Sequence, residues 1–466
     1  MDRLSPLDAA FLQMEDEDPN ASLAIGSLAL AEGPAPTQKE FTAAFTRLLP
    51  LIPRYRQRVQ RVPLDLGPPI WVDDAHFEPT RHLHRIAAPA PGDETTLCDL
   101  VAMLMAPRLD RDRPLWECWL IEGLERGRWA ILSKVHHCMT DGVAGNALHE
   151  VLFSDHPPPV PPAEPEPAPG TVRLLVGSLY GLLTSPLELA RFLTGVVTEP
   201  GRLVRRMADA ARGLGTMATA LVPVAPSSLS GPIGRERRYE LAHASLSHIV
   251  AIAHAFGVTV NDVVLAAISG AFREVLLDRG EEPGQDTLRT LVPVSVRAKA
   301  AKTIMDNRIS LMVPLLPVEE PDAVSRLSAV HRRITDIKAR KESEAGVAVT
   351  TCARHAPFAP IAWAVRAAAK LPQRSIATIA TNIAGPRHEL SVLGRRIVDL
   401  YPYVPIALRL RTGIAVLSYA DRLSFGITAD LDTAAKARFL ADAIEHDLAT
   451  LAEAARTVQA DRGPAK

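Results

Sequence analysis

A run of prolines divides this 466-residue chain more firmly than any other feature of its sequence. Residues 157–169 read PPPVPPAEPEPAP. Because proline fixes φ and has no backbone N–H group, such a stretch cannot continue a helix or pair inside a sheet. It is typical of a stiff, extended linker. We therefore predict two folded domains, over 1–153 and 226–466, with a proline-rich linker at 154–172.

Helix-like and strand-like patterns alternate on both sides of the linker, which predicts two α/β domains. Thr37 is placed to cap a helix that starts near Gln38 and carries Phe41, Phe45 and Leu48 on one face. The other expected elements are helices at 97–105, 142–152, 246–256 and 261–277, strands at 130–135, 290–296 and 309–316, and a hairpin of 414–419 with 423–428.

Residues 173–225, which follow the linker, form an amphipathic stretch rich in Leu, Val, Gly and Ala with interspersed arginines. Two structures fit this pattern. The stretch can lie in a lipid interface with its arginines toward anionic headgroups, or it can be a long helical connector packed on the body of the protein. Its apolar segment Leu174–Leu187 is shorter than the about 20 residues that cross a bilayer, so we expect no transmembrane span.

The overall composition limits the functions open to the chain. The 52 Lys and Arg residues almost balance the 53 Asp and Glu residues, so no net field attracts nucleic acid. The four cysteines lie far apart without a C-x-x-C pair, which suits neither a structural zinc site nor a disulfide framework. The N-terminus has no apolar export segment. We expect a cytoplasmic protein with reduced thiols that binds no nucleic acid.

The motif with the clearest chemical content is HHCMTDG, which starts at His136 and His137 after an apolar strand. Asp141 and Gly142 predict a tight turn. Because side chains alternate along a strand, the two histidines are expected to point to opposite faces, so they cannot easily share a metal. No third ligand stands at a zinc-like spacing. We therefore expect no metal site, and one imidazole that faces a cleft.

A neutral imidazole in a cleft suits general-base catalysis, because it can take a proton from a hydroxyl that attacks an acyl carbon. No protein nucleophile is then needed, and the chain lacks both the G-x-S-x-G elbow and the P-loop. Cys138 is an alternative nucleophile, but adjacent side chains diverge, which disfavours a Cys-His pair. His82 and His84 fit either a metal pair on one strand face or ordinary cleft histidines.

The motif and several further blocks resemble the wax ester synthase/acyl-CoA:diacylglycerol acyltransferase family, within the HHxxxDG superfamily of CoA-dependent acyltransferases. The resemblance covers nearly the whole chain in the family's order. Its blocks are RLSPLDAAFLQME at the N-terminus, PLW at 114–116, HHCMTDG at 136–142, the ND block in VTVNDVVLAAISGAFR, PVSVR ending at Arg297, TNIAGPRHEL, and SYADRLSFGITAD.

The resemblance implies a role for each residue of the motif. His137 is the expected general base, and His136 is its structural neighbour. Asp141 is expected to organise the loop through an ion pair with an arginine such as Arg297, and Gly142 permits the turn.

Three residues outside the motif are also implied. Asn261 is expected to make a polar contact near the active site, with a helix N-cap as the alternative. Pro114 and Trp116 are expected to shape the site. The implied fold is α/β: two chloramphenicol-acetyltransferase-like domains, joined by a long connector at 173–225, with the active-site channel between them.

The family further implies an O-acyltransferase that moves a long-chain acyl group from acyl-CoA to diacylglycerol, giving triacylglycerol, or to a long-chain alcohol, giving a wax ester. It needs no cofactor, because acyl-CoA is the co-substrate. The expected location is the inner face of the cell membrane or a lipid-droplet surface, bound peripherally. Two alternatives stay open: another alcohol or amine acceptor within the superfamily, and a non-catalytic protein that coats lipid surfaces.

Overall fold

The computed structural model describes residues 2–139, 169–170, 173–176, 179–180, 224–295, 309–339, 358–370, 375–432 and 436–461. Asp141, Gly142 and Arg297 lie outside these residues, as do the helix expected at 142–152, most of the linker and most of the connector. The predictions for them therefore stay predictions.

The N-terminal region is built on a six-stranded sheet with the order β12-β13-β2-β7-β6-β5. All of its pairs are antiparallel except β5 with β6. A small antiparallel sheet, β1-β4-β3, lies beside it. The strands are β12 (Ser391–Val392), β13 (Arg395–Tyr403), β2 (Ala24–Ala31), β7 (Arg128–His136), β6 (Trp116–Leu124), β5 (Leu83–Ala87), β1 (Asp2–Arg3), β4 (Ile70–Asp73) and β3 (Gln57–Gln60); the helices are α1 (Pro6–Glu17), α2 (Gln38–Leu48) and α3 (Glu94–Met105).

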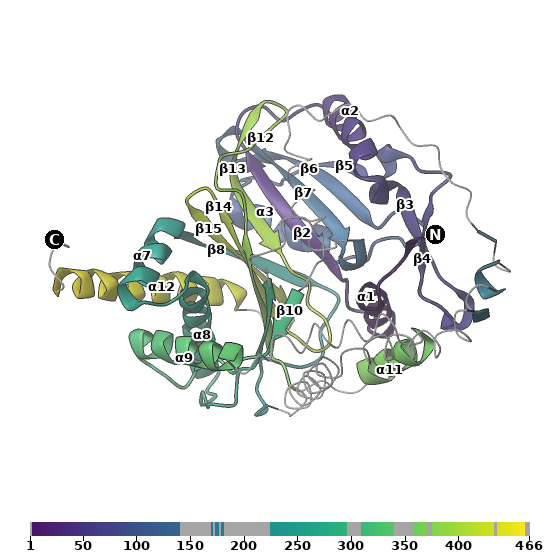
Figure 1. Ribbon diagram of the computed structural model, residues 1–466. Coiled ribbons are helices and arrows are strands. Elements are labelled where there is room, and N and C mark those ends of the chain that lie inside the picture. Colours follow the sequence, from purple (N-terminus) through teal and green to yellow (C-terminus); the bar gives the residue numbers. More distant parts are fainter. Residues whose placement is uncertain are drawn as a thin grey trace, which may run out of the picture.

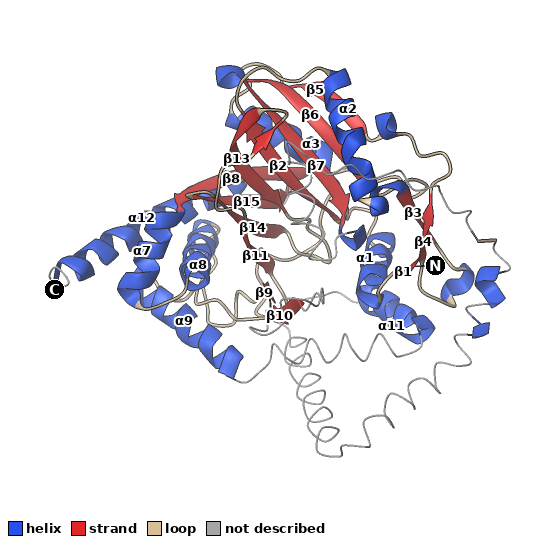
Figure 2. Ribbon diagram, turned by 45° about the horizontal axis from the view of Figure 1, so that its top comes forward, coloured by secondary structure: helices blue, strands red, loops and turns tan. Residues whose placement is uncertain are grey.

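The C-terminal region is built on a second six-stranded sheet with the order β10-β9-β11-β14-β15-β8. Figure 2 shows α7, α8, α9 and α12 on one side of this sheet, whereas α11 lies apart from them, beside α1. The strands are β10 (Ile309–Met312), β9 (Thr290–Ser295), β11 (Thr378–Ala384), β14 (Thr412–Tyr419), β15 (Arg422–Asp430) and β8 (Arg237–Ser245); the helices are α7 (Leu246–Phe256), α8 (Val260–Asp278), α9 (Ala323–Ala339), α12 (Ala437–Asp461) and α11 (Phe358–Lys370).

Two strands of the C-terminal region, β12 and β13, complete the N-terminal sheet. β13 pairs antiparallel with β2, with Leu400 opposite Ala29, and Figure 1 shows this yellow-green strand beside the purple β2. Its side chains Ile397 and Leu400 are fully buried in the core of the N-terminal region. Strands β12 and β13, from the expected domain over 226–466, therefore belong to the other sheet. Their pairing supplies hydrogen-bond partners for backbone groups that β2 would otherwise expose at a sheet edge.

Local sequence signals place most other elements where they were predicted. Thr37 caps α2 in a capping box with Glu40. The helices expected at 97–105, 246–256 and 261–277 correspond to α3, α7 and α8, and the hairpin corresponds to β14 and β15. The strand expected at 309–316 is shorter and ends at Met312, because Pro314 has no N–H group to donate to the ladder.

No helix in the described part of the chain is by itself long and apolar enough to cross a membrane. By length and composition alone one pair passes the test, α7 with α8, which is bent by 99°.

A polar contact also joins the two regions. Nε2 of His243, on β8, lies 3.0 Å from Oε2 of Glu94, in the first turn of α3. The hydrogen bond to Glu94 raises the pKa of His243 against the opposing effect of burial, and the same bond lowers the pKa of Glu94. Arg438, on α12, lies 3.8 Å from the same carboxylate. The junction therefore contains a histidine whose protonated form is stabilised by its contact with Glu94.

The stability of this junction should depend on pH. Because the folded-state pKa of His243 is raised, its ionic contribution is present below the ordinary histidine pKa and is lost as pH rises through the raised value. Scanning calorimetry of His243→Gln should therefore show a larger drop in Tm at about pH 5.5 than at about pH 8.5. The control is His76→Gln, in an exposed turn. Equal drops at both pH values would contradict the prediction.

Candidate active site

The two histidines of the motif lie where β7 ends. His136 is the last residue of β7, and His137 opens a short 3-10 turn, η6 (His137–Met139). The backbone N–H of His136 donates to the carbonyl of Leu115, and that of His137 donates to the carbonyl of Leu23, both at 2.9 Å. The segments on either side of β7 therefore hold the backbone where it leaves the sheet.

Both imidazole rings contact α1. The ring of His137 stacks on Phe11 with centroids 4.1 Å apart, and Nε2 of His136 lies 3.5 Å from Oε2 of Glu15. Phe11 and Glu15 are four residues apart, so they share one face of α1. The prediction that the two histidines face opposite sides is wrong, because His137 lies beyond the strand, in a turn where strand alternation no longer applies.

The protonation of the His136 ring follows from its contacts. Its Nδ1 accepts a hydrogen bond from the backbone N–H of Cys138 at 3.2 Å. A ring nitrogen that accepts carries no proton, so the proton of His136 is on Nε2, which faces the Glu15 carboxylate. His136 thus links the turn to α1.

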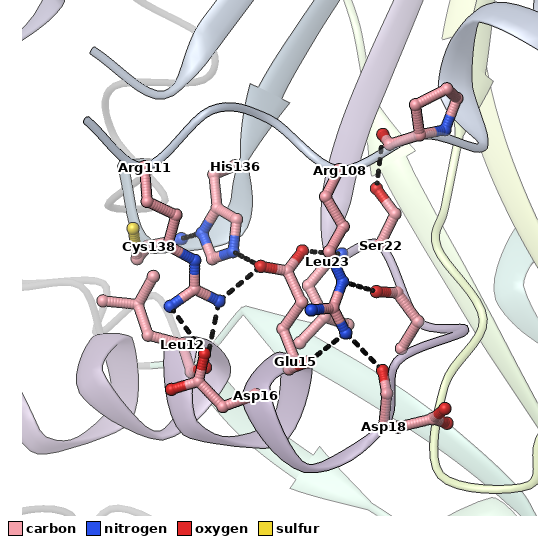
Figure 3. Close-up of polar contacts among 12 residues, drawn as sticks. Leu12, Glu15, Asp16, Asp18, Ser22, Leu23, Arg108, Arg111, His136 and Cys138 are labelled. Atoms are coloured by element: carbon pink, nitrogen blue, oxygen red, sulfur yellow. Dashed lines mark hydrogen bonds and ion pairs between the residues drawn. The ribbon is translucent and has the colours of Figure 1, made fainter. Parts of the chain in front are cut away.

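Glu15 is a buried carboxylate with partners on both oxygens, as Figure 3 shows. Oε1 accepts from the backbone N–H of Leu23 at 2.9 Å, and Oε2 pairs with Arg111 and faces His136. Burial alone raises the pKa of Glu15, but the contacts with His136, the N–H of Leu23 and the charge of Arg111 outweigh it, and the pKa lies at about 2. The carboxylate is therefore charged at physiological pH.

Two further cations fasten the backbone around this carboxylate. Arg108 donates to the carbonyl of Ala21 at 2.8 Å and also to the carbonyls of Glu15 and Asp18 (Figure 3). Nζ of the buried Lys134, on β7, donates to the carbonyls of Leu104 and Pro107 at 2.9 and 2.7 Å. Together they tie the end of α1, the end of α3 and β7 into one frame.

The ring of His137 is neutral. Burial lowers its pKa to about 4, although a hydrogen bond to its own backbone opposes this effect. The ring is therefore unprotonated at physiological pH and can accept a proton.

Cys138 does not have the properties of a nucleophile. Its side chain is buried beside the turn, and this burial raises the pKa of the thiol above its ordinary value. A nucleophilic cysteine needs the thiolate form, which a raised pKa disfavours. The arrangement thus supports a base without a covalent partner.

The PLW block reaches the site through its backbone. Trp116 itself is buried in the core, where its ring stacks on Phe45 and on His82, with centroids 4.9 and 4.5 Å away. The carbonyl of Pro114 accepts a hydrogen bond from the N–H of Trp116 at 2.9 Å. The carbonyl of Leu115, between them, accepts the hydrogen bond from the N–H of His136. The block therefore positions the end of β7.

His82 has a structural place in this core, where its Nδ1 lies 2.8 Å from the carbonyl of Trp116. Among the residues that the structure describes, no group of three or more His, Cys, Asp or Glu side chains could hold a metal ion.

Asn261 lies in the C-terminal region, in the first turn of α8. The N-cap of this helix is Thr259, in a capping box with Asp262, so the alternative role of Asn261 as the N-cap is wrong. Its Oδ1 accepts from Nδ2 of Asn382, on β11, at 3.5 Å. This pair joins the ND block to the TNIAG block.

Phe11, Glu15 and Arg111 are residues that sequence analysis missed. The first two lie in the N-terminal block RLSPLDAAFLQME, and their spacing of four residues places them on one helix face. This spacing is the sequence signal that could have placed Phe11 and Glu15 together. Their proximity to His136 and His137 depends on the packing of α1 against the end of β7, which is a long-range contact that no local pattern encodes.

A cavity of about 620 Å³ opens beside this frame, between the two regions. Its volume falls in the range of ligand-binding pockets. The residues that line it are Pro19, Asn20, Ala21, Asp99, Ala102, Met103, Ala106, Pro107 and Arg108 from the N-terminal region, and Arg235, Glu236, Arg237 and Leu431 from the C-terminal region.

Comparison with known families and curated proteins agrees along nearly the whole chain. Residues 4–264 match the wax ester synthase/diacylglycerol acyltransferase catalytic domain, and residues 305–452 match the WS/DGAT C-terminal domain. A Mycobacterium tuberculosis protein named a probable diacylglycerol O-acyltransferase is 46% identical over 453 residues, covering 97% of this chain and 96% of that protein.

Solved structures share the fold. A wax ester synthase/diacylglycerol acyltransferase from Marinobacter aquaeolei superposes with a TM-score of 0.65 at 24% identity, covering 97% of this chain and all of that one. The starter condensation domain of rhizomide synthetase, solved with C8-CoA, gives a TM-score of 0.56 at 14% identity, covering 98% of this chain and 95% of that one. These likenesses confirm the expected fold class.

Removing the ring that covers His137 should raise its pKa. Phe11→Ala admits water to the imidazole, so its pKa should rise from about 4 toward the ordinary value of about 6.5. NMR titration of the labelled histidine ring measures this. Phe77→Ala, which removes a ring stacked on His82 instead, should leave the pKa of His137 unchanged. A titration midpoint that stays near 4 in Phe11→Ala would contradict the role of Phe11.

Proposed function

The chain belongs to the wax ester synthase/diacylglycerol acyltransferase family, and we propose that it transfers a long-chain acyl group from acyl-CoA to diacylglycerol, with His137 as the general base. The observation that carries this proposal is the position of His137 in the HHCMTDG motif at the end of β7, where its part-buried imidazole stacks on Phe11 and is neutral at physiological pH. Long-chain alcohols are the second acceptor class, which would give wax esters.

The reaction needs one base and no covalent intermediate. His137 takes the proton of the acceptor hydroxyl as its oxygen attacks the thioester carbonyl. The tetrahedral intermediate collapses, the C–S bond breaks, and the CoA thiolate leaves. The imidazolium then gives its proton to the CoA thiolate, which is released as the free thiol, so His137 is neutral for the next turnover. General-base catalysis of this kind contributes about 10²- to 10⁴-fold in rate. Acyl-CoA supplies the activated acyl group, so we propose no cofactor.

Support for diacylglycerol as the acceptor comes from the curated relatives, since the Mycobacterium tuberculosis protein at 46% identity carries that activity in its name. The Marinobacter enzyme, at 24% identity, is named for both activities. Another alcohol or amine acceptor and a non-catalytic lipid coat remain the competing hypotheses. The neutral His137 within an ordered cluster argues against the second, because a lipid coat has no need of it.

We place the active-site channel between the two regions. The cavity beside Arg108 and Asn20 supports this placement, since it is lined from both regions and adjoins the loop that follows Glu15. For the residues of the motif outside the described part of the chain, we propose that Asp141 forms an ion pair with an arginine such as Arg297 and that Gly142 permits the turn.

A peripheral position on the inner membrane face or on lipid droplets is supported by two exposed apolar side chains. Leu7, on α1, is 45% exposed, and Trp363, on α11, is 55% exposed. The two helices pack side by side (Figure 1), and α1 is the helix that contacts both histidines. Tryptophan favours the membrane interface because its ring is amphipathic. A lipid surface that covers these helices would place a lipid acceptor near the site.

Substitution of the base tests the function directly. Purified protein is given palmitoyl-CoA with diacylglycerol or hexadecanol separately, and CoA release is measured. His137→Ala should reduce kcat by about 100-fold or more, because the hydroxyl loses its proton acceptor. Cys138→Ala, at the next residue, should retain activity. A folded His137→Ala variant with unchanged turnover, or a Cys138→Ala variant without turnover, would overturn the mechanism.

The lipid-facing surface has its own test. Leu7→Ser with Trp363→Ser should lower the protein fraction that floats with phosphatidylcholine/phosphatidylglycerol vesicles by about tenfold, because burial of two apolar side chains is lost. Met103→Ser is the matched control, since Met103 is equally exposed but lies on α3. Flotation that falls equally in the control, or in neither variant, would contradict this surface.

A further inference from the structure

We propose that Glu15 is a positioning residue for the acyl transfer, and that it acts through His136 on the turn that carries His137. This inference rests on the proposed function and adds a part to it, namely the group that aligns the base. Three connections join Glu15 to the turn, and each of them is a contact in the structure.

The first connection runs through the His136 ring. Oε2 of Glu15 faces the protonated Nε2 of His136, and the opposite nitrogen of the same ring, Nδ1, accepts from the N–H of Cys138. Cys138 is the second residue of η6, directly after the base. The orientation of one ring therefore sets the backbone on the far side of His137, and Glu15 sets the orientation of that ring.

The second connection runs through the backbone of Leu23. Its N–H donates to Oε1 of Glu15 at 2.9 Å, and its carbonyl accepts from the N–H of His137 at 2.9 Å. The same carboxylate thus fixes both the residue before the base, through its ring, and the base itself, through its N–H group. A shift of Glu15 would move both supports.

The third connection is α1 itself. Phe11, one turn before Glu15, stacks on the ring of His137 at 4.1 Å. Arg111 holds this helix by pairing with Glu15 and by donating to the carbonyl of Leu12 at 3.1 Å. The face of α1 that carries Phe11 and Glu15 is therefore fixed relative to the end of β7.

The arrangement requires the charged carboxylate of Glu15. An uncharged side chain of the same size, such as glutamine, cannot replace it. In Glu15→Gln the carbonyl oxygen can still accept from Leu23, but the new amide N–H groups then face the Arg111 guanidinium and the Nε2–H of His136. Donors would face donors, which leaves buried polar groups without partners. The His136 ring would have to turn or move its proton to Nδ1, and either change removes the hydrogen bond from Cys138.

The first experiment compares Glu15→Gln with Asp16→Asn. Both remove one negative charge from a partner of Arg111, but only Glu15 contacts His136. With palmitoyl-CoA and diacylglycerol, Glu15→Gln should lower kcat by about 10- to 100-fold while KM for each substrate changes less than about threefold, because the base is misaligned and the substrates still bind. Asp16→Asn should change kcat less than about threefold. Equal effects of the two substitutions would overturn the proposal.

The second experiment asks whether Glu15 acts through His136. His136→Asn keeps an acceptor for the N–H of Cys138 but removes the group that faces Glu15, so it should cost about the same in kcat as Glu15→Gln. In the His136→Asn background, adding Glu15→Gln should lower kcat by less than about a further threefold. If the double variant instead shows the product of the two single losses in kcat, Glu15 does not act through His136, and the proposal is overturned. If Glu15→Gln does not fold, His136→Asn alone decides, and wild-type kcat in that variant would overturn it.

The two levels of the account can fail separately. If His137→Ala keeps its turnover, the proposed function fails whatever Glu15 does. If His137→Ala is inactive while Glu15→Gln behaves like Asp16→Asn, the function stands and only the positioning role of Glu15 is wrong.

Discussion

A single buried carboxylate holds together the region around the two histidines of the motif. Glu15 is charged inside the protein because Arg111, His136 and the N–H of Leu23 surround it, and their contacts outweigh the effect of burial on its pKa. A buried charge is tolerated only when its partners are complete. The cluster therefore fixes α1, β2 and β7 in one arrangement, and the turn with His137 follows from it.

The same region is stabilised by the way the two halves of the chain share their sheets. β13 returns from the C-terminal region to pair with β2, the strand that follows Leu23. The core of the N-terminal region accordingly includes Ile397 and Leu400. The supports of the site are therefore built from both ends of the chain, and the cavity between the regions lies beside them. A site formed in this way cannot be assigned to one domain alone.

The sequence predicted what depends on local pattern and missed what depends on long-range packing. The capping signal at Thr37 and the hairpin of β14 and β15 are encoded by neighbouring residues. The HHCMTDG motif, from which we propose His137 as the base, is equally local. The transfer of β13 to the other sheet joins residues more than 360 positions apart, and strand pairing of that kind leaves no local signal. Glu15 was missed for the same reason, since an acidic residue in an amphipathic helix indicates a solvated face until its partner is known.

Burial keeps His137 neutral at physiological pH, and the proposed mechanism requires this neutral form as the base. The most direct measurement is the pH dependence of kcat/KM for diacylglycerol at saturating palmitoyl-CoA, because its acid limb reports the ionisation of the form that binds the acceptor. The account predicts a flat profile through neutral pH, with a fall centred near the His137 pKa of about 4. An acid limb centred near the ordinary histidine value of about 6.5 would contradict it.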